Sequence, residues 1–73
     1  MALKHRKLSM RGLHTFCTAA RHRTLGQAAE ELFVTPSAVS HQLKKLEAEL
    51  GLPLFERQGR TLALTEAGEM LYE

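Results

Sequence analysis

Aspartate, asparagine, isoleucine and tryptophan are all absent from this 73-residue chain, and cysteine occurs only once. A single cysteine excludes an internal disulfide framework and a zinc site made of cysteines. No apolar run approaches the roughly 18 residues that a membrane span requires. We therefore expect a soluble, cytoplasmic protein that has no membrane contact, no metal and no cofactor. A chain this short also leaves little room for a deep substrate pocket, so an enzyme is not expected.

The residues that are abundant favour helix. The chain contains thirteen leucines, nine alanines and eight glutamates, against two valines and six threonines. Leucine, alanine and glutamate are good helix formers, whereas the β-branched residues that a large sheet needs are few. The composition therefore predicts one small, mainly helical domain.

The net charge of +2 conceals an uneven distribution. Residues 1–23 contain six lysines or arginines and no acid, so they carry +6. Residues 24–73 contain four basic residues and all eight glutamates, so they carry −4. The basic residues are thus gathered in local patches, and the fold must decide where these patches lie.

Four helices are predicted from their N-terminal caps. Because neither Asp nor Asn is available, this role falls to serine and threonine. Ser9, Thr24, Thr35 and Thr65 each precede a segment with apolar residues at helical spacing. The first helix is expected to end near residues 21–23, and its predicted buried stripe consists of Leu13, Phe16, Cys17 and Ala20.

The second and third helices are separated by only a few residues. Thr24 and Gln27 fit a capping box, and the second helix is expected to end around residues 33–34. Thr35 and Pro36 predict the third helix, over about residues 36–50, because proline suits the first helical position. Its apolar face consists of Val39, Leu43, Leu46 and Leu50, and its opposite face of Ser37, His41, Lys44, Lys45 and Ala48, with Ser40 at the flank.

Residues 54–64 differ from the helical segments. Leu62 and Leu64 alternate with less apolar residues, and Gln58 and Gly59 interrupt the segment, which predicts a small hairpin. Thr65 then caps a fourth helix. Because its apolar stripe is still running at residue 73, we expect the chain to be part of a longer protein.

Two helices joined by so short a connection predict a helix-turn-helix. The start of the third helix carries small and polar residues, as required for close approach to base edges in a DNA major groove. Ser37, Ser40 and His41 can hydrogen-bond to bases, Ala38 can contact a thymine methyl group, and the lysines suit phosphates. The hairpin would be a wing, in which Arg57 and Arg60 meet the DNA backbone or a narrow minor groove.

The chain resembles the N-terminal domain of LysR-type transcriptional regulators. The resemblance rests on residues 24–32 (TLGQAAEEL), 34–40 (VTPSAVS), 46–47 (LE), 50–57 (LGLPLFER) and 64–68 (LTEAG), and it extends over residues 8–73. It implies a winged helix-turn-helix over 8–64, preceded by a basic arm over 1–7. It also implies that residues 65–73 begin a linker helix, through which a bacterial regulator forms homodimers, and that an effector binds a separate C-terminal domain.

The resemblance also carries over to individual positions. It assigns DNA contacts to the start of the third helix and to the wing: Thr35, Pro36, Ser37, Ser40, His41, Lys44, Arg57 and Arg60. Lys45 and Thr24 are further candidates, from the charge of the third helix and the start of the second. Two positions depart from the family pattern. His41 replaces a frequent arginine, and Gly26 replaces a frequent serine or threonine that could bind a phosphate.

Several residues have a second interpretation. Ser37 and His41 have the spacing of a nucleophile and base, but no aspartate is available to orient the histidine. Cys17 is expected in the core, and residues 21–23 either cap the first helix or contact phosphate. The basic arm is either a solvated tail or a minor-groove arm. For the whole domain, the alternative to DNA binding is a protein-interaction module.

Three further assignments concern the surface. Glu30 and Glu31 are expected to face solvent, whereas Met10, Met70 and Tyr72 are expected in the core or in a dimer seam.

Overall fold

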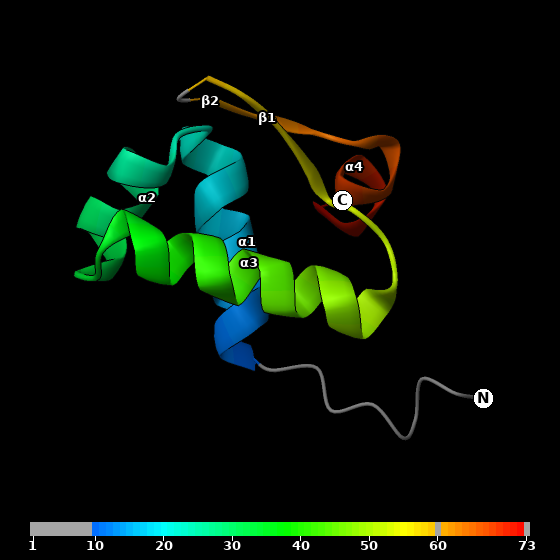
Figure 1. Ribbon diagram of the computed structural model, residues 1–73, viewed down its shortest axis with the longest axis horizontal. Helices are drawn as coiled ribbons and strands as arrows, with labels where there is room; N and C mark the ends of the chain where they lie inside the picture. Colours follow the sequence, from blue (N-terminus) through cyan, green and yellow to red (C-terminus); the bar gives the residue numbers. More distant parts are fainter. Residues whose placement is uncertain (1–9, 60, 73) are drawn as a thin grey trace.

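A three-helix bundle carries a two-stranded sheet and a short fourth helix on one side (Figure 1). The computed structural model describes residues 10–59 and 61–72. Its elements are α1 (Met10–His22), α2 (Leu25–Leu32), α3 (Pro36–Leu50), β1 (Phe55–Gln58), β2 (Thr61–Leu64) and α4 (Glu66–Tyr72). The arm over 1–7, the Ser9 cap and Arg60 lie outside the described residues. The predicted element order is confirmed.

Threonine hydroxyls cap three of the helices as predicted. The Oγ1 atoms of Thr24, Thr35 and Thr65 accept hydrogen bonds from the backbone N–H three residues later, at 3.2, 3.1 and 3.0 Å. Pro36 takes the first position of α3. Each cap satisfies one of the N–H groups that a helix start leaves without a partner, so the local sequence alone places these starts.

The predicted buried face is confirmed in α3 but is wrong at one position of α1. Cys17 is exposed, and the buried face of α1 consists instead of Gly12, Thr15, Phe16, Thr18, Ala19 and Ala20. Because α1 packs against both α2 and α3, small residues are needed where the helices meet. The hydroxyls do not prevent burial, since Thr15 donates to Gln42 Oε1 and Thr18 to the His14 carbonyl.

The turn between α2 and α3 depends on a left-handed residue. Phe33 has φ 59° and ψ 41°, and its N–H caps α2 by bonding to the Ala29 and Glu30 carbonyls. Its side chain is 93% exposed. Non-glycine residues in this region are strained by about 1 kcal/mol or more. The helix-turn-helix geometry therefore requires a conformation that the phenylalanine does not favour.

The wing is an antiparallel hairpin in which Phe55 pairs with Leu64 and Gln58 with Thr61. Gly59 begins its turn at φ 65°. The backbone of the hairpin and its entry is attached to the helices in two places. The Leu62 N–H donates to the Arg23 carbonyl at 2.8 Å, and Glu47 Oε2 on α3 accepts from the Leu54 and Phe55 N–H groups at 2.7 and 3.2 Å. The wing is thereby held beside α3.

Helix α4 packs against β2 and leaves apolar side chains exposed. Met70 is 71% exposed and Tyr72 is 44% exposed, although the Tyr72 ring meets Phe16 edge-on at 6.2 Å. Met10 is 78% exposed. Of the two places expected for them, the core is therefore wrong for Met10 and Met70 in this domain, because no other described element covers them, and a dimer seam stays a prediction.

Gly68 provides a test of how tightly α4 is seated. A Cβ atom at Gly68 would lie 2.2 Å from the Leu54 carbonyl oxygen, so Gly68→Ala is expected to lower the free energy of unfolding by about 2–3 kcal/mol. Gly26→Ala is the matched control, since a Cβ atom there meets nothing within 4 Å and alanine favours helix by about 1 kcal/mol. Urea unfolding measures both. A Gly68→Ala protein as stable as the wild type would show that α4 is free to shift.

Candidate nucleic-acid interface

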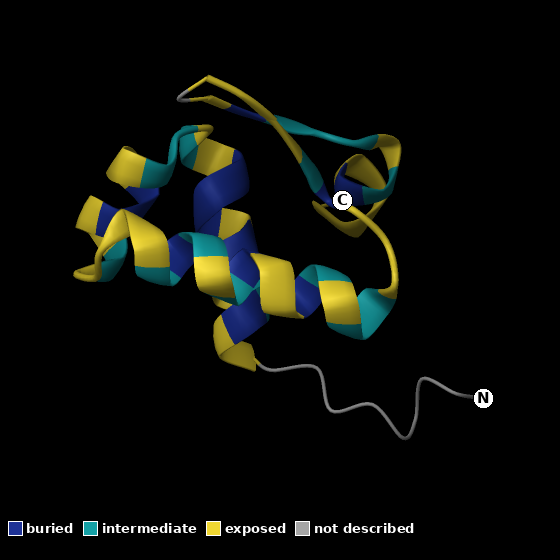
Figure 2. Cartoon of the chain, viewed as in Figure 1, coloured by how far each residue is buried: buried dark blue, intermediate teal, exposed yellow. Residues whose placement is uncertain are grey.

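The outer face of α3 is exposed in the pattern that its sequence predicts. Ser37, His41, Lys44 and Lys45 are exposed, Ser40 and Ala38 are half-buried, and exposed residues recur along each turn of the helix (Figure 2). Thr35 and Pro36 are exposed at its N-terminal end. No acidic residue occurs on α3 before Glu47, whose carboxylate is turned toward the wing. The first half of this helix therefore presents small, polar and cationic groups only.

A shallow groove joins this face to the wing. Its volume is about 340 Å³, and it brings together six of the ten candidate residues: Pro36, Ser37, Ser40, His41, Lys44 and Arg57. Leu25 at the start of α2 completes the lining. The tertiary structure thus gathers residues from α3 and β1 into one surface. Among the other candidates, Thr35 caps α3, Thr24 and Lys45 line neighbouring hollows, and Arg60 lies outside the described residues.

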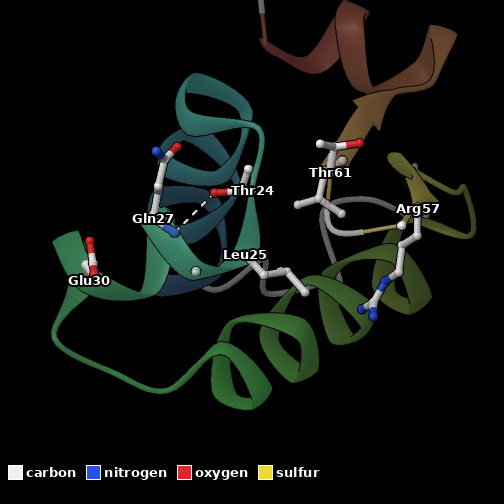
Figure 3. Close-up of a pocket in the computed structure, with 9 residues that line it drawn as sticks. Thr24, Leu25, Gln27, Glu30, Arg57 and Thr61 are labelled. Atoms are coloured by element: carbon white, nitrogen blue, oxygen red, sulfur yellow. Dashed lines mark hydrogen bonds between the residues drawn. The ribbon is translucent and has the colours of Figure 1, made fainter.

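Arg57 connects the two sides of the groove. Its side chain extends from β1 toward α3 (Figure 3), and its Nη2 donates a hydrogen bond to Ser40 Oγ. The two residues are 17 positions apart in the sequence, so no local pattern could have predicted their contact. The guanidinium is therefore placed at the edge of the surface that Ser37 and His41 also line.

A second hollow, of about 570 Å³, separates the start of α2 from the wing. Thr24, Gly26 and Gln27 line one side, and Gly59 and Thr61 line the other (Figure 3). The Thr24 hydroxyl accepts from the Gln27 N–H, but the Gln27 side chain points away, so only half of the predicted capping box is present. The N–H groups and macrodipole at the start of a helix favour an anion.

Sequence reasoning missed Arg11 as a neighbour of the outer face of α3. Arg11 lines a hollow of about 230 Å³ together with His41, Lys45 and Glu49. Thirty residues separate Arg11 from His41, and only the packing of α1 against α3 brings them to the same hollow. The uneven charge distribution was the one available signal, because it placed an excess of basic residues before residue 24.

Glu31 is exposed as predicted, but it also binds two basic residues of α1. Arg21 Nη2 contacts Glu31 Oε2, and His22 Nε2 lies 2.6 Å from Glu31 Oε1. Hydrogen bonds from Arg21 and then from His22 lower the pKa of Glu31 to about 2. The hydrogen bond and the charge of Glu31 in turn raise the pKa of Arg21. Arg21 and His22 therefore already have an acidic partner within the fold.

The described residues contain neither a cluster of metal ligands nor a helix that could cross a membrane. Within 10–59 and 61–72, no three His, Cys, Asp or Glu side chains gather where a metal ion could bind. In the same part of the chain, no helix has the length and apolar character needed to cross a membrane.

Comparisons of the sequence with known proteins find regulators. Residues 10–69 match the family described as bacterial regulatory helix-turn-helix protein, lysR family. The glycine cleavage system transcriptional activator of Escherichia coli K12 is 54% identical over 63 residues, which is 86% of this chain and 21% of that protein. The regulator CbbR of Rhodospirillum rubrum is 46% identical over 69 residues, which is 94% of this chain and 23% of that protein. The chain thus spans about a fifth of the length of these curated relatives.

Solved structures share the fold. The CbnR_DBD–DNA complex superimposes with a TM-score of 0.85 at 34% identity, covering 88% of this chain and 74% of that one. The BenM_DBD complex with benA site 1 DNA superimposes with a TM-score of 0.82 at 31% identity, covering 88% of this chain and 72% of that one. A LysR-family regulator from Eggerthella lenta gives 0.79 at 40% identity, covering 86% and 90%. The helices, wing and α4 described above therefore have the winged-helix arrangement of this family.

The lowered pKa of Glu31 predicts a pH dependence of stability. A carboxyl whose pKa falls from 4.5 to about 2 on folding stabilises the fold above about pH 4.5, and this contribution is lost as the pH falls toward about 2. Glu31→Gln should therefore lower the melting temperature near neutral pH but make it less sensitive to acid over that window. Because the pair is exposed, high salt should weaken the effect.

Glu30→Gln is the matched control, since Glu30 is exposed on the same helix and does not share the Arg21 and His22 contacts. Thermal unfolding followed by circular dichroism between about pH 2 and pH 7 compares the variants. Equal acid sensitivity of Glu31→Gln and wild type would contradict a stabilising role for this ion pair.

Proposed function

This chain belongs to the lysR family of bacterial regulatory helix-turn-helix proteins, and from that premise we propose that it binds double-stranded DNA in a sequence-specific manner. One observation supports this most directly. The exposed first half of α3 carries no acid and lies in one groove with two cationic side chains, Lys44 and Arg57. A surface of this kind suits a polyanion with readable base edges.

In the proposed complex, α3 enters the major groove with its N-terminal half. Ser37, Ser40 and His41 face base edges, and Ala38 contacts a thymine methyl group. Lys44 and Lys45 lie one turn further along and bind phosphates. His41, as an imidazole, cannot form the paired contacts by which an arginine recognises guanine.

Contacts to the DNA backbone flank the base-reading surface. Arg57 and Arg60 of the wing meet phosphates or a narrow minor groove, and Thr35 and Pro36 approach the backbone where α3 begins. Thr24 places the start of α2 toward another phosphate. Arg11 extends the phosphate-binding surface beyond Lys45, because the two line the same hollow.

We further propose how the domain serves a longer regulator. Residues 8–64 form the winged helix-turn-helix, residues 1–7 a basic arm, and residues 65–73 the start of a linker helix. The exposed Met70, Leu71 and Tyr72 of α4 suit a helix partner in a homodimer, which would read a two-fold related site. A separate domain would bind an effector and control transcription. The protein would act in the cytoplasm and not as an enzyme.

Variants of His41 and Lys44 distinguish base recognition from attraction to the phosphates. His41→Ala is expected to cost about 1–3 kcal/mol of binding free energy on the preferred sequence and much less on random duplex. Lys44→Ala should weaken binding to both duplexes. It should also reduce the slope of the logarithm of the binding constant against the logarithm of the salt concentration by about one. Selection from a random duplex pool, followed by fluorescence anisotropy at several salt concentrations, measures these effects.

Two outcomes would contradict the assignments. Equal loss on preferred and random duplexes for His41→Ala would remove His41 from the base-reading residues. If the wild-type domain binds neither heparin nor random duplex at low salt, the surface is better explained as a protein-interaction module.

Gly26 offers a gain of affinity. Its position on α2 is exposed, and a side chain there meets nothing within 4 Å. Gly26→Ser should increase DNA affinity about fivefold relative to Gly26→Ala, because only serine adds a hydroxyl that can donate to a phosphate. The alanine variant controls for the helix-stabilising effect of losing glycine. Equal affinities of the two variants would show that no phosphate lies within reach of this position.

A further inference from the structure

The contact between Arg57 and Ser40 limits the hydrogen bonds that Ser40 has left to make to its donor hydrogen and one lone pair. A serine hydroxyl has one donor hydrogen and two acceptor lone pairs. Arg57 Nη2 donates to Ser40 Oγ and thereby occupies one lone pair. A guanidinium has no acceptor, so Arg57 can never receive the hydroxyl hydrogen. That hydrogen must therefore point elsewhere.

No group of the described residues accepts a hydrogen bond from the Ser40 hydroxyl. Serines within helices often donate to the carbonyl four residues earlier, as Thr18 does on α1. Ser40 makes no such bond, and over residues 10–59 and 61–72 its hydroxyl finds no acceptor. Ser40 is half-buried and lines the groove between α3 and the wing. Its remaining donor is therefore available on the side that the proposed function assigns to DNA.

We propose that Arg57 is a positioning residue for Ser40, which makes the serine a hydrogen-bond donor in base recognition. This inference rests on the proposed function. Without Arg57, the hydroxyl could accept from the amino group of cytosine or adenine as readily as it donates. With Arg57 bound, one lone pair of Ser40 is occupied and the positive guanidinium disfavours the approach of a second N–H donor to the other. Ser40 then favours a base edge that offers an acceptor, which is guanine O6 or N7, adenine N7 or thymine O4. Cytosine, which presents only an amino donor there, is disfavoured.

The guanidinium can serve this purpose and still contact the backbone. It has five N–H donors, of which the bond to Ser40 uses one. The others remain for a phosphate, so the phosphate-binding role proposed for the wing is retained. Arg57 would then bind a phosphate and orient the Ser40 hydroxyl at the same time. The phosphate contact carries no sequence information itself, but it would hold Arg57 where it makes the base contact of Ser40 more selective.

A double-mutant cycle tests the coupling. The base pair read by Ser40 is first identified as the position whose preference Ser40→Ala removes from a site selected with the wild-type domain. Affinities for all four bases at that position are then measured for wild type, Arg57→Ala, Ser40→Ala and the double variant. We expect Arg57→Ala to reduce discrimination against cytosine about fivefold at that position. In the Ser40→Ala background, loss of Arg57 should change no base preference.

Lys44→Ala is the matched control, because Lys44 lines the same groove and its loss removes the same charge but keeps the hydrogen bond from Arg57 to Ser40. It should weaken binding to all four bases alike. Because Arg57 is exposed, its removal should leave the melting temperature of the domain nearly unchanged. Arg57→Lys, which keeps a charged donor, should recover part of the discrimination that Arg57→Ala loses.

The outcomes separate the inference from the function on which it rests. A wild-type domain without any sequence preference would overturn both. A specific wild type whose preference survives Arg57→Ala, or whose Ser40→Ala variant loses no preference at any position, would overturn the coupling alone. An equal loss of discrimination among the four bases in Lys44→Ala would also overturn the coupling. The loss of a positive charge, rather than of the orientation of Ser40, would then explain the result for Arg57→Ala.

Discussion

The position of the wing depends on one carboxylate. Glu47 on α3 accepts the N–H groups of both Leu54 and Phe55, which are the first residues after the turn that follows α3. Because both donors are backbone N–H groups, the carboxylate fixes the direction in which the chain leaves α3 and enters β1. The hydrogen bond from the Leu62 N–H to the Arg23 carbonyl attaches β2 to the residue that follows α1. Arg57 can reach Ser40 only because these two attachments hold β1 beside α3.

The same arrangement explains how a chain of modest net charge presents a cationic surface. Glu47 is turned inward against the wing, and Glu31 is bound by Arg21 and His22 at the contact between α1 and α2. Neither carboxylate faces the groove beside α3. The basic residues of this groove therefore need no numerical excess, because neither Glu31 nor Glu47 is among the residues that line it. The placement of charges matters more here than their sum.

Much of the fold was predictable because its signals are local. A threonine cap needs only the N–H three residues later, and the outer face of α3 follows from the helical repeat. The buried face of α1 was predicted less well. Cys17 was assigned to the core and is exposed, whereas Thr15 and Thr18 are buried. Hydropathy favours the cysteine, but the close approach of two helices favours small residues whose hydroxyls find partners.

The candidate site shows the same division. The sequence by itself determined the helix starts, the polar face of α3 and the presence of arginine in a hairpin, since each follows from residues a few positions apart. Only the tertiary structure decided that Arg57 meets Ser40, that Arg11 lines the same hollow as Lys45 and that Glu31 takes two basic partners. These arrangements bring together residues 9 to 34 positions apart, so they depend on how the helices and the wing pack, which no local pattern specifies.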